Sequence, residues 1–261
     1  MSEVRSGFHA VVTADGRMPV FAASPAEAGR RYPAVILYMD FWGAREELHG
    51  MARHVASRGY CCLVPDFYYR QGKVRDVLRD ANGKVLSLKA LDPATREQVL
   101  MPLRNLTDDM VVEDTRSLLD GLGNIQAAAP APVGVIGYCL GGRLVLKVAA
   151  AFPDRVRATA SIHPNSLMTD KPDSPHLLLD RLRGGLYFGL AQMDRHTPPD
   201  VIARLERIVR DCTVRCSIET HVGVDHGYAL PDRDIYDAAA SAKDWERVFA
   251  LFGHELEAAN P

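Results

Sequence analysis

The chain has 261 residues, of which 47% are hydrophobic and 25% are charged, and its formal net charge is −2. That balance gives no electrostatic basis for binding nucleic acid or an anionic membrane surface. The first residues lack the apolar core of a signal peptide, and no apolar run is long enough to cross a bilayer. Five cysteines without zinc spacing favour a reducing setting. We therefore expect a cytoplasmic globular protein.

The expected elements alternate between buried strands and amphipathic helices. A hairpin is expected first, over residues 9–13 and 18–22. Strands are then expected at residues 34–39, 60–64, 133–136, 156–162, 185–190 and 214–219. Helices are expected at residues 46–57, 108–121, 201–209 and 236–252. This alternation predicts the α/β class, with a mostly parallel central sheet, helices on both faces and a single domain over residues 1–261.

The region 68–104 interrupts this alternation, because its hydrophobic periodicity is weak. It contains the turn signals Gln71-Gly72, Asn82-Gly83 and Asp92-Pro93. A long irregular insertion near the carboxyl ends of strands is typical of a lid or a binding loop. We expect this insertion to overhang a functional site.

The most informative stretch is Gly137-Tyr138-Cys139-Leu140-Gly141-Gly142, which directly follows the apolar run at residues 133–136. An apolar helical pattern begins at once after it. This is the pattern of the nucleophile elbow G-x-S-x-G, with cysteine in the serine position. The elbow places the sulfur at a helix N-terminus, where a thiolate is favoured. The alternative is a buried structural cysteine, since free cysteines are among the most buried residue types.

A hydrolase of this kind needs an acid and then a histidine downstream of its nucleophile. Asp194 follows the expected strand 185–190, and His226 lies in a glycine-flanked loop after the strand 214–219. Each has an ordinary alternative, a helix cap for Asp194 and a solvated loop residue for His226. His196 and His221 are rival histidines. The chain order and the element boundaries favour Cys139, Asp194 and His226 together.

These motifs resemble those of the dienelactone hydrolase family. The nucleophile motif around Cys139, Asp194 and the stretch Asp225-His226-Gly227-Tyr228 carry the resemblance, together with Pro65-Asp66-Phe67-Tyr68-Tyr69-Arg70. The matched stretches run from about residue 33 to residue 250. The resemblance implies an α/β-hydrolase fold and a cysteine nucleophile.

Further roles are implied by the same resemblance. Arg96, in Thr95-Arg96-Glu97-Gln98, matches a family arginine that binds a substrate carboxylate. Asp40 stands where the family carries a glutamate that interacts with the resting cysteine, and it is one methylene shorter. Leu230 replaces a second family arginine, so we expect a less acidic substrate and a mainly apolar pocket shaped in part by Trp42 and Tyr138.

The expected chemistry is attack of Cys139 on the carbonyl of a small-molecule ester or lactone, with His226 as acid and base and Asp194 as its orienting group. The backbone N–H groups of Leu140 and Phe41 are expected to form the oxyanion hole. No metal or organic cofactor is needed. Two other functions stay open at this point. They are an acyltransferase or other-bond hydrolase on the same fold, and a non-catalytic binding protein.

Overall fold

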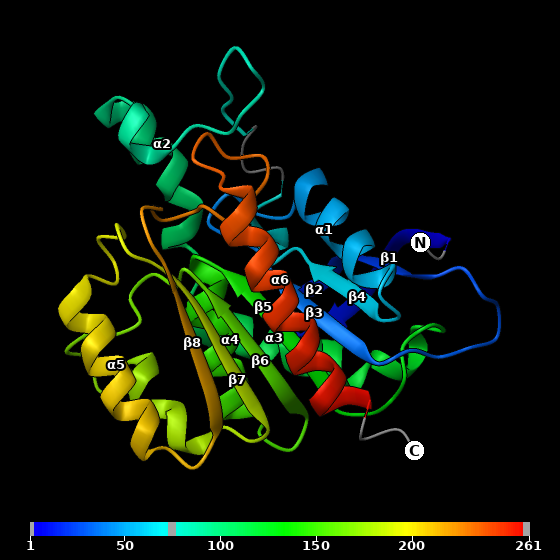
Figure 1. Ribbon diagram of the computed structural model, residues 1–261. Helices are drawn as coiled ribbons and strands as arrows, with labels where there is room; N and C mark the ends of the chain where they lie inside the picture. Colours follow the sequence, from blue (N-terminus) through cyan, green and yellow to red (C-terminus); the bar gives the residue numbers. More distant parts are fainter. Residues whose placement is uncertain (1–2, 73–76, 258–261) are drawn as a thin grey trace.

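The computed structural model describes residues 3–72 and 77–257, and its centre is one eight-stranded sheet (Figure 1). The strand order is β1-β2-β4-β3-β5-β6-β7-β8. Strands β3 to β8 run parallel to one another, whereas β2 pairs antiparallel with both β1 and β4. The strands span Val4–Thr13, Gly16–Pro25, Ala34–Tyr38, Cys61–Pro65, Val133–Tyr138, Val156–Ile162, Gly185–Ala191 and Arg215–His221.

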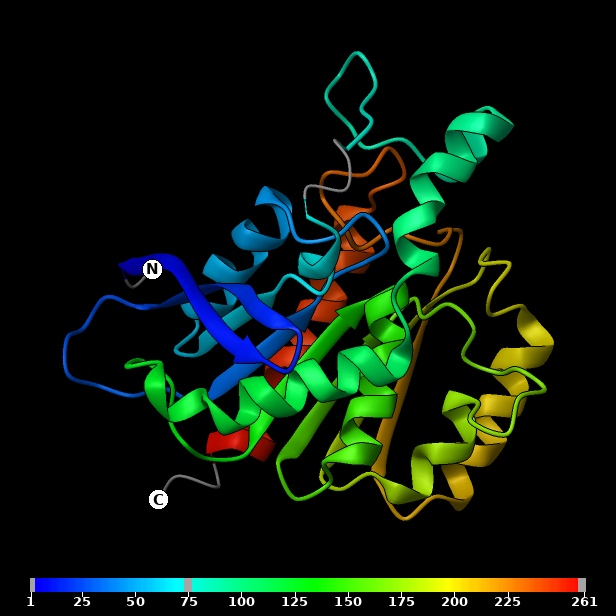
Figure 2. The same ribbon diagram turned by 180° about the vertical axis from the view of Figure 1, so that it is seen from behind.

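Helices cover both faces of this sheet. Helices α1 and α6 lie on the face seen in Figure 1, and α3 and α4 lie on the face seen in Figure 2, while α5 flanks β8. From α1 to α6 they span Glu46–Ala56, Pro93–Arg104, Asp108–Asp120, Leu140–Ala151, Pro199–Asp211 and Ala238–Phe252. Short 3-10 turns span Tyr69–Gln71, Leu88–Ala90, Leu122–Asn124 and Pro175–Arg181, and a π turn, Gly253–Glu257, follows α6. Among the described residues, no helix combines the length and apolarity that crossing a membrane requires.

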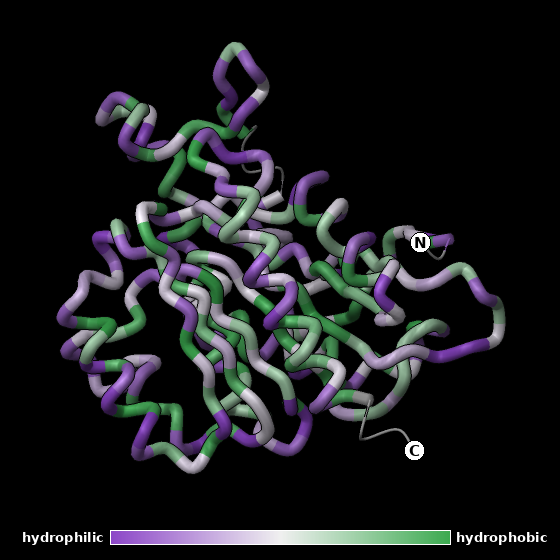
Figure 3. The backbone as a smooth tube through the Cα atoms, viewed as in Figure 1, coloured by the Kyte–Doolittle hydropathy of each residue, from purple (hydrophilic) through white to green (hydrophobic). Residues whose placement is uncertain are grey.

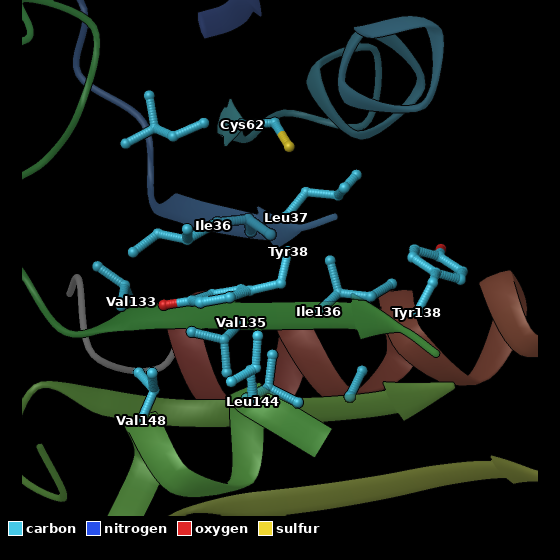
Figure 4. Close-up of a cluster of buried hydrophobic side chains, with 14 of the residues drawn as sticks. Ile36, Leu37, Tyr38, Cys62, Val133, Val135, Ile136, Tyr138, Leu144 and Val148 are labelled. Carbon is cyan, nitrogen blue, oxygen red and sulfur yellow. The ribbon is translucent and has the colours of Figure 1, made fainter. Parts of the chain in front are cut away.

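The main core lies between the sheet and its helices, where the apolar residues of the strands gather (Figure 3). In Figure 4, Val135 of β5 lies next to Leu144 of α4, while Ile36 and Leu37 belong to the neighbouring strand β3. All four side chains are fully buried. Parallel strands covered on both faces have to be apolar along their whole length, as β3 and β5 are.

The predicted alternation of strands and helices is confirmed, with boundaries that differ by a few residues. The strand expected at residues 156–162 is Val156–Ile162, and the helix expected at residues 46–57 is Glu46–Ala56. Thr107 accepts a hydrogen bond from the Met110 N–H and so caps α3.

The insertion is more ordered than its weak periodicity predicts. It contains the twelve-residue helix α2, Pro93–Arg104. The Asp92 carboxylate accepts hydrogen bonds from the N–H groups of Ala94 and Thr95, and Pro93 occupies the first helical position. Asp92-Pro93 is therefore a helix start, because proline needs no hydrogen-bond acceptor there. Residues 73–76 of the predicted insertion lie outside the described residues.

Three loops meet at one edge of the sheet, because they follow the carboxyl ends of parallel strands. Cys139 follows β5, Asp194 follows β7, and His226 lies in the segment after β8. Helix α2 lies at the same end of the molecule as the segment after β8 (Figure 1). The fold thus gathers all three predicted catalytic residues and the insertion at one place.

Candidate active site

Cys139 occupies a strained backbone position between β5 and α4. Its φ is 55° and its ψ is −109°, a region that L residues rarely adopt. Strain of this kind costs on the order of 1–3 kcal/mol and is concentrated at functional sites. The geometry is that of a nucleophile elbow, in which the side chain projects from a sharp strand-to-helix turn.

Glycine is required on both sides of this turn because neighbouring backbone leaves no room for a side chain. A Cβ on Gly137 would lie 2.2 Å from the carbonyl oxygen of Gly141, and a Cβ on Gly141 would lie 2.5 Å from that of Tyr38. The Cys139 N–H also donates to the Ile162 carbonyl at 3.1 Å. The elbow is therefore fixed by close backbone contacts with β3 and β6.

The predicted acid and base are in direct contact. The Nδ1 atom of His226 lies 2.7 Å from Oδ2 of Asp194. Asp194 is buried, and its other oxygen accepts a hydrogen bond from the His196 N–H at 2.7 Å. The carboxylate thus holds the imidazole with Nε2 on the opposite side of the ring. That atom is buried and makes no hydrogen bond of ordinary geometry within the described residues.

Cys139 is close enough to act on the His226 imidazole. Burial on its own would lower the pKa of His226, but the negative charge of the Cys139 thiolate and the hydrogen bond with Asp194 outweigh it and raise that pKa to about 10. A thiolate beside an imidazolium is the reactive form of a cysteine nucleophile.

The other nearby histidines have different surroundings. The rival His221 is buried, and its Nε2 lies 2.7 Å from Oδ1 of Asp244, a carboxylate that also accepts hydrogen bonds from two tyrosine hydroxyls. The other rival, His196, packs its ring 4.8 Å from that of His226. His163 packs edge-on against His226 at 5.0 Å, and burial lowers its pKa well below the usual range. The pairing with Asp194 thus distinguishes His226 from these three.

A cavity of about 260 Å³ opens beside Cys139 and His226. Its apolar wall comes from Phe41, from Ile235 and from three leucines of the insertion, Leu88, Leu100 and Leu103. Its polar lining consists of Ser87, Lys89, Asn165, Arg195, His196, Asp225 and Arg233. Six buried residues here form a cluster separate from the main core, which we call the roof cluster: Phe41, Trp42, Val85, Leu91, Val99 and Cys139. The insertion therefore covers Cys139 with apolar side chains.

Residues 18–256 match the model of the dienelactone hydrolase family. The chain belongs to this family. The predicted α/β-hydrolase fold is confirmed, as is the prediction of a hydrolase of the dienelactone hydrolase type.

The relative and the two structures named next match over nearly their whole length. A Synechocystis sp. protein with the provisional name carboxymethylenebutenolidase is 28% identical over 240 residues, which are 91% of this chain and 92% of that protein. A crystal structure from Klebsiella pneumoniae, of a protein provisionally named dienelactone hydrolase, has a TM-score of 0.80 at 21% identity. The match covers 97% of this chain and 99% of that one. The structure of the dienelactone hydrolase-like promiscuous phosphotriesterase P91, from metagenomic libraries, has a TM-score of 0.72 at 16% identity. The match covers 97% of this chain and 98% of that one. At these identities the structures show the fold alone.

The residues expected from the family resemblance do not all lie at the cavity. Phe41, Cys139 and His226 line it, and Asp194 lies directly behind His226. Leu140 is the first residue of α4, where a backbone N–H has no acceptor within its own helix. Trp42 and Tyr138 are buried but do not line the cavity.

The two charged residues of that set are occupied elsewhere. The guanidinium of Arg96 donates to the carbonyl oxygens of Leu88 and Leu91, at 3.0 and 3.1 Å, and so stabilises the insertion itself. Among the described residues, the Asp40 carboxylate accepts hydrogen bonds from Arg45 and from the Trp42 N–H and makes none with Cys139. Among the described residues, neither side chain reaches the cavity lining.

Sequence reasoning missed the cations that do line the cavity, namely Lys89, Arg195 and Arg233. Arg233 is only 5% exposed. Its Nε has no hydrogen-bond partner among residues 3–72 and 77–257, and it lies 4.0 Å from Oδ1 of Asp234. The position of one further polar residue of the cavity, Asn165, could have been predicted from the sequence. Asn165 follows the strand 156–162 closely and had to lie at the same sheet edge as Cys139.

One group at this site has the composition of a metal site. Asp194, His196 and His226 each offer a ligand atom, and these atoms lie within 4.8 Å of one another. Carboxylate and imidazole ligands suit zinc and similar divalent ions. A metal there would compete with the hydrogen bond between His226 and Asp194. The ligand atoms of these two residues can therefore bind a metal or each other, but not both at once.

Proposed function

We propose that this protein hydrolyses a carboxylic ester or lactone through a covalent thioester on Cys139. The observation that carries the proposal is the 2.7 Å contact between His226 and Asp194, at a cavity that also exposes a cysteine on a strained elbow. An oriented base beside a nucleophile is the arrangement that covalent hydrolysis needs.

The reaction runs in two halves. The Cys139 thiolate attacks the carbonyl carbon, and the C–O bond to the leaving group breaks as His226 gives that oxygen its proton. Neutral His226 then removes a proton from water, which attacks the thioester and releases the acid and the thiolate. We propose that the N–H groups of Leu140 and Phe41 stabilise the oxyanion in both halves, each donor contributing about 3 kcal/mol.

The cavity favours a small substrate with an apolar body and one anionic or strongly polar group. Leucines of the insertion cover the apolar part, so we propose that residues 68–104 serve as a lid or binding loop. An acid group would gain most beside Arg233, because a buried guanidinium binds a carboxylate strongly and its Nε has no partner in the described part of the chain. Arg96 would influence carboxylate binding indirectly, by stabilising the conformation of the insertion.

The setting we propose is the cytoplasm. All five cysteines are free, and two of them, Cys61 and Cys62, are adjacent and buried. A reducing compartment keeps such thiols unpaired.

The test is an activity screen of the purified protein on aryl esters, enol-lactones and saturated lactones, with and without prior iodoacetamide treatment. We expect hydrolysis of at least one class and its loss after alkylation of Cys139. Products carrying an added alcohol or amine would identify an acyltransferase instead. Substrate binding without turnover would identify a binding protein.

A further inference from the structure

A buried arginine joins the two loops that flank the nucleophile. The Nη1 atom of Arg45 lies 2.6 Å from Oδ1 of Asp40, and its Nη2 lies 3.3 Å from Oδ2. Its Nε lies 2.7 Å from Oδ2 of Asp232, and Nη2 also lies 3.0 Å from Oδ1 of that residue. One guanidinium thus forms two-point contacts with two carboxylates. We call Asp40, Arg45 and Asp232 the Arg45 clamp.

The clamp is shielded from water. The exposed fractions of Asp40, Arg45 and Asp232 are 0%, 8% and 6%. Loss of one partner would leave a buried charge without compensation, which is strongly unfavourable. Two-point contacts also fix the relative orientation of the planar groups, which a single ammonium cannot do. The clamp therefore fixes the positions of Asp40 and Asp232 relative to each other.

One end of the clamp shapes the loop that carries Phe41. The Asp40 carboxylate accepts the Trp42 N–H at 3.1 Å, and the Gly43 N–H donates to the Asp40 carbonyl at 3.1 Å. Arg45 closes the same turn by donating to the Gly43 carbonyl at 3.2 Å. The orientation of the Phe41 backbone, the proposed oxyanion donor, therefore depends on the Asp40–Arg45 contact.

The other end holds the segment that carries His226. Asp232 follows His226 by six residues, and its carbonyl accepts the Val85 N–H of the insertion at 2.7 Å. Arg79 of the insertion adds a longer contact, 3.7 Å, to the Asp232 carboxylate. The clamp is thus shared by the oxyanion loop, the histidine segment and the insertion.

We propose that Arg45 is a positioning residue for catalysis, which sets the oxyanion loop relative to the histidine segment. The inference rests on the proposed function, because it assigns roles to the two loops in thioester chemistry. It predicts that the two ends of the clamp have different effects. Breaking the Asp40 end misplaces an oxyanion donor, whereas breaking the Asp232 end disturbs His226 and thereby the Cys139 thiolate.

Two reactions of Cys139 separate these effects. Hydrolysis of 4-nitrophenyl acetate passes through an oxyanion and needs the oxyanion hole. Alkylation by iodoacetamide is a displacement at a saturated carbon, so it forms no oxyanion and reports the thiolate alone. The other thiols interfere little near neutral pH, since burial raises the pKa of Cys61 and Cys216 to about 12 and that of Cys212 to about 11. Burial also raises the pKa of Cys62 well above its usual range.

The experiment measures both rates and the melting temperature for Asp40→Asn, Asp232→Asn and Arg45→Lys in the full chain. For Asp40→Asn we expect kcat/KM for the ester to fall about 10- to 100-fold with the alkylation rate nearly unchanged. For Asp232→Asn we expect both rates to fall. Arg45→Lys keeps the charge but not the two-point contacts, so its ester activity should lie between that of the native protein and that of Asp40→Asn.

The matched control is Asp114→Asn. Asp114 is also buried and accepts hydrogen bonds from the Arg70 guanidinium at 2.7 and 2.8 Å, but it does not line the cavity. This variant should lower the melting temperature and leave both rates unchanged. If Asp40→Asn behaves like the control, or lowers both rates equally, the clamp only stabilises the fold. If native ester hydrolysis survives alkylation of Cys139, the proposed function fails and the inference fails with it.

Discussion

The elbow and the insertion build the two sides of one cavity in different ways. At the elbow, backbone packs on backbone so tightly that a Cβ on Gly137 would lie 2.2 Å from a carbonyl oxygen. The insertion instead packs in the roof cluster through apolar side chains. It also makes polar contacts with the histidine segment, such as the Val85 N–H to the Asp232 carbonyl and the Lys89–Asp225 ion pair. Lys89 is 64% exposed, so that ion pair contributes little to stability.

This difference separates two tasks. The elbow has one permitted geometry, which suits a nucleophile that must meet a carbonyl carbon at a fixed angle. The insertion supplies apolar side chains whose shape can vary without moving the nucleophile. Substitutions at the elbow should therefore change the chemical step, whereas those facing the insertion should change which substrate binds.

The largest effect should come from the nucleophile. Cys139→Ala removes the atom that forms the thioester and should lower kcat for ester hydrolysis by at least ~10³-fold. Cys139→Ser should retain some activity, because the elbow and His226 remain. The control is Cys212→Ala, which should behave like the native protein. Near-native activity in Cys139→Ala, with loss in the control, would move the nucleophile elsewhere.

The histidine should rank second. His226→Gln removes the proton carrier and should reduce turnover by roughly 10²- to 10⁴-fold, with little change in melting temperature. His196→Gln is the matched control, because that ring lies 4.8 Å from His226 and, in the part of the chain that the structure describes, only the His196 backbone N–H bonds to Asp194. It should have a mild effect. Normal turnover in His226→Gln would refute the assignment.

The pH dependence should distinguish the cysteine from its serine variant. In the native protein the imidazolium, with a pKa of about 10, supplies the proton to the leaving group. As pH rises through that value the imidazolium is lost, so kcat/KM should fall on the alkaline side. In Cys139→Ser the thiolate that chiefly raises this pKa is gone, and neutral His226 must act as the base. Its kcat/KM should therefore rise with pH through a lower pKa. Identical pH profiles of kcat/KM for the native protein and Cys139→Ser, measured from pH 5 to 10.5, would contradict an ion pair between Cys139 and His226.

The smallest effect should appear on the binding side. Arg233→Gln should raise KM about 10-fold for a substrate bearing a carboxylate and leave neutral aryl esters nearly unchanged, because one charged hydrogen-bonded contact is lost. Arg96→Ala provides the comparison. Its guanidinium holds the carbonyls of Leu88 and Leu91, so a shift in KM for both substrate types would indicate an effect through the insertion. A carboxylate-specific effect of Arg96→Ala alone would favour Arg96 as the direct anchor.

The sequence predicts well what depends on neighbouring residues. A glycine-flanked cysteine between an apolar run and a helical pattern leaves few structures open, and strand ends in a parallel sheet bring Asp194 and His226 to the same edge. Helix α2 is not predicted as a definite element, because Asp92-Pro93 is also a turn signal and a short helix around Arg96 is only an alternative. The same dipeptide also starts helices, and the interior Pro102 obscured the pattern that follows.

Contacts between distant residues could not be predicted in this way. Arg45 and Asp232 are 187 positions apart, and nothing in the local sequence of either indicates the other. For the same reason Arg96 was expected at the cavity, whereas Arg233 lines it. A charged side chain near a catalytic motif has many possible partners, and only the folded chain determines which one it meets.

The separation of the roof cluster from the main core has an evolutionary consequence. Val85, Leu91 and Val99 of the insertion pack against Phe41, Trp42 and Cys139 in the roof cluster. The sheet and its helices form the separate main hydrophobic core. Leu103 also packs against the main core, but the other apolar residues of the segment named here do not belong to that cluster. Selection can therefore change the shape of segment 77–104 with a small effect on the main core. Transplanting this segment between family members should transfer substrate range as a unit, and such modular exchange offers a route by which one hydrolase scaffold diversifies.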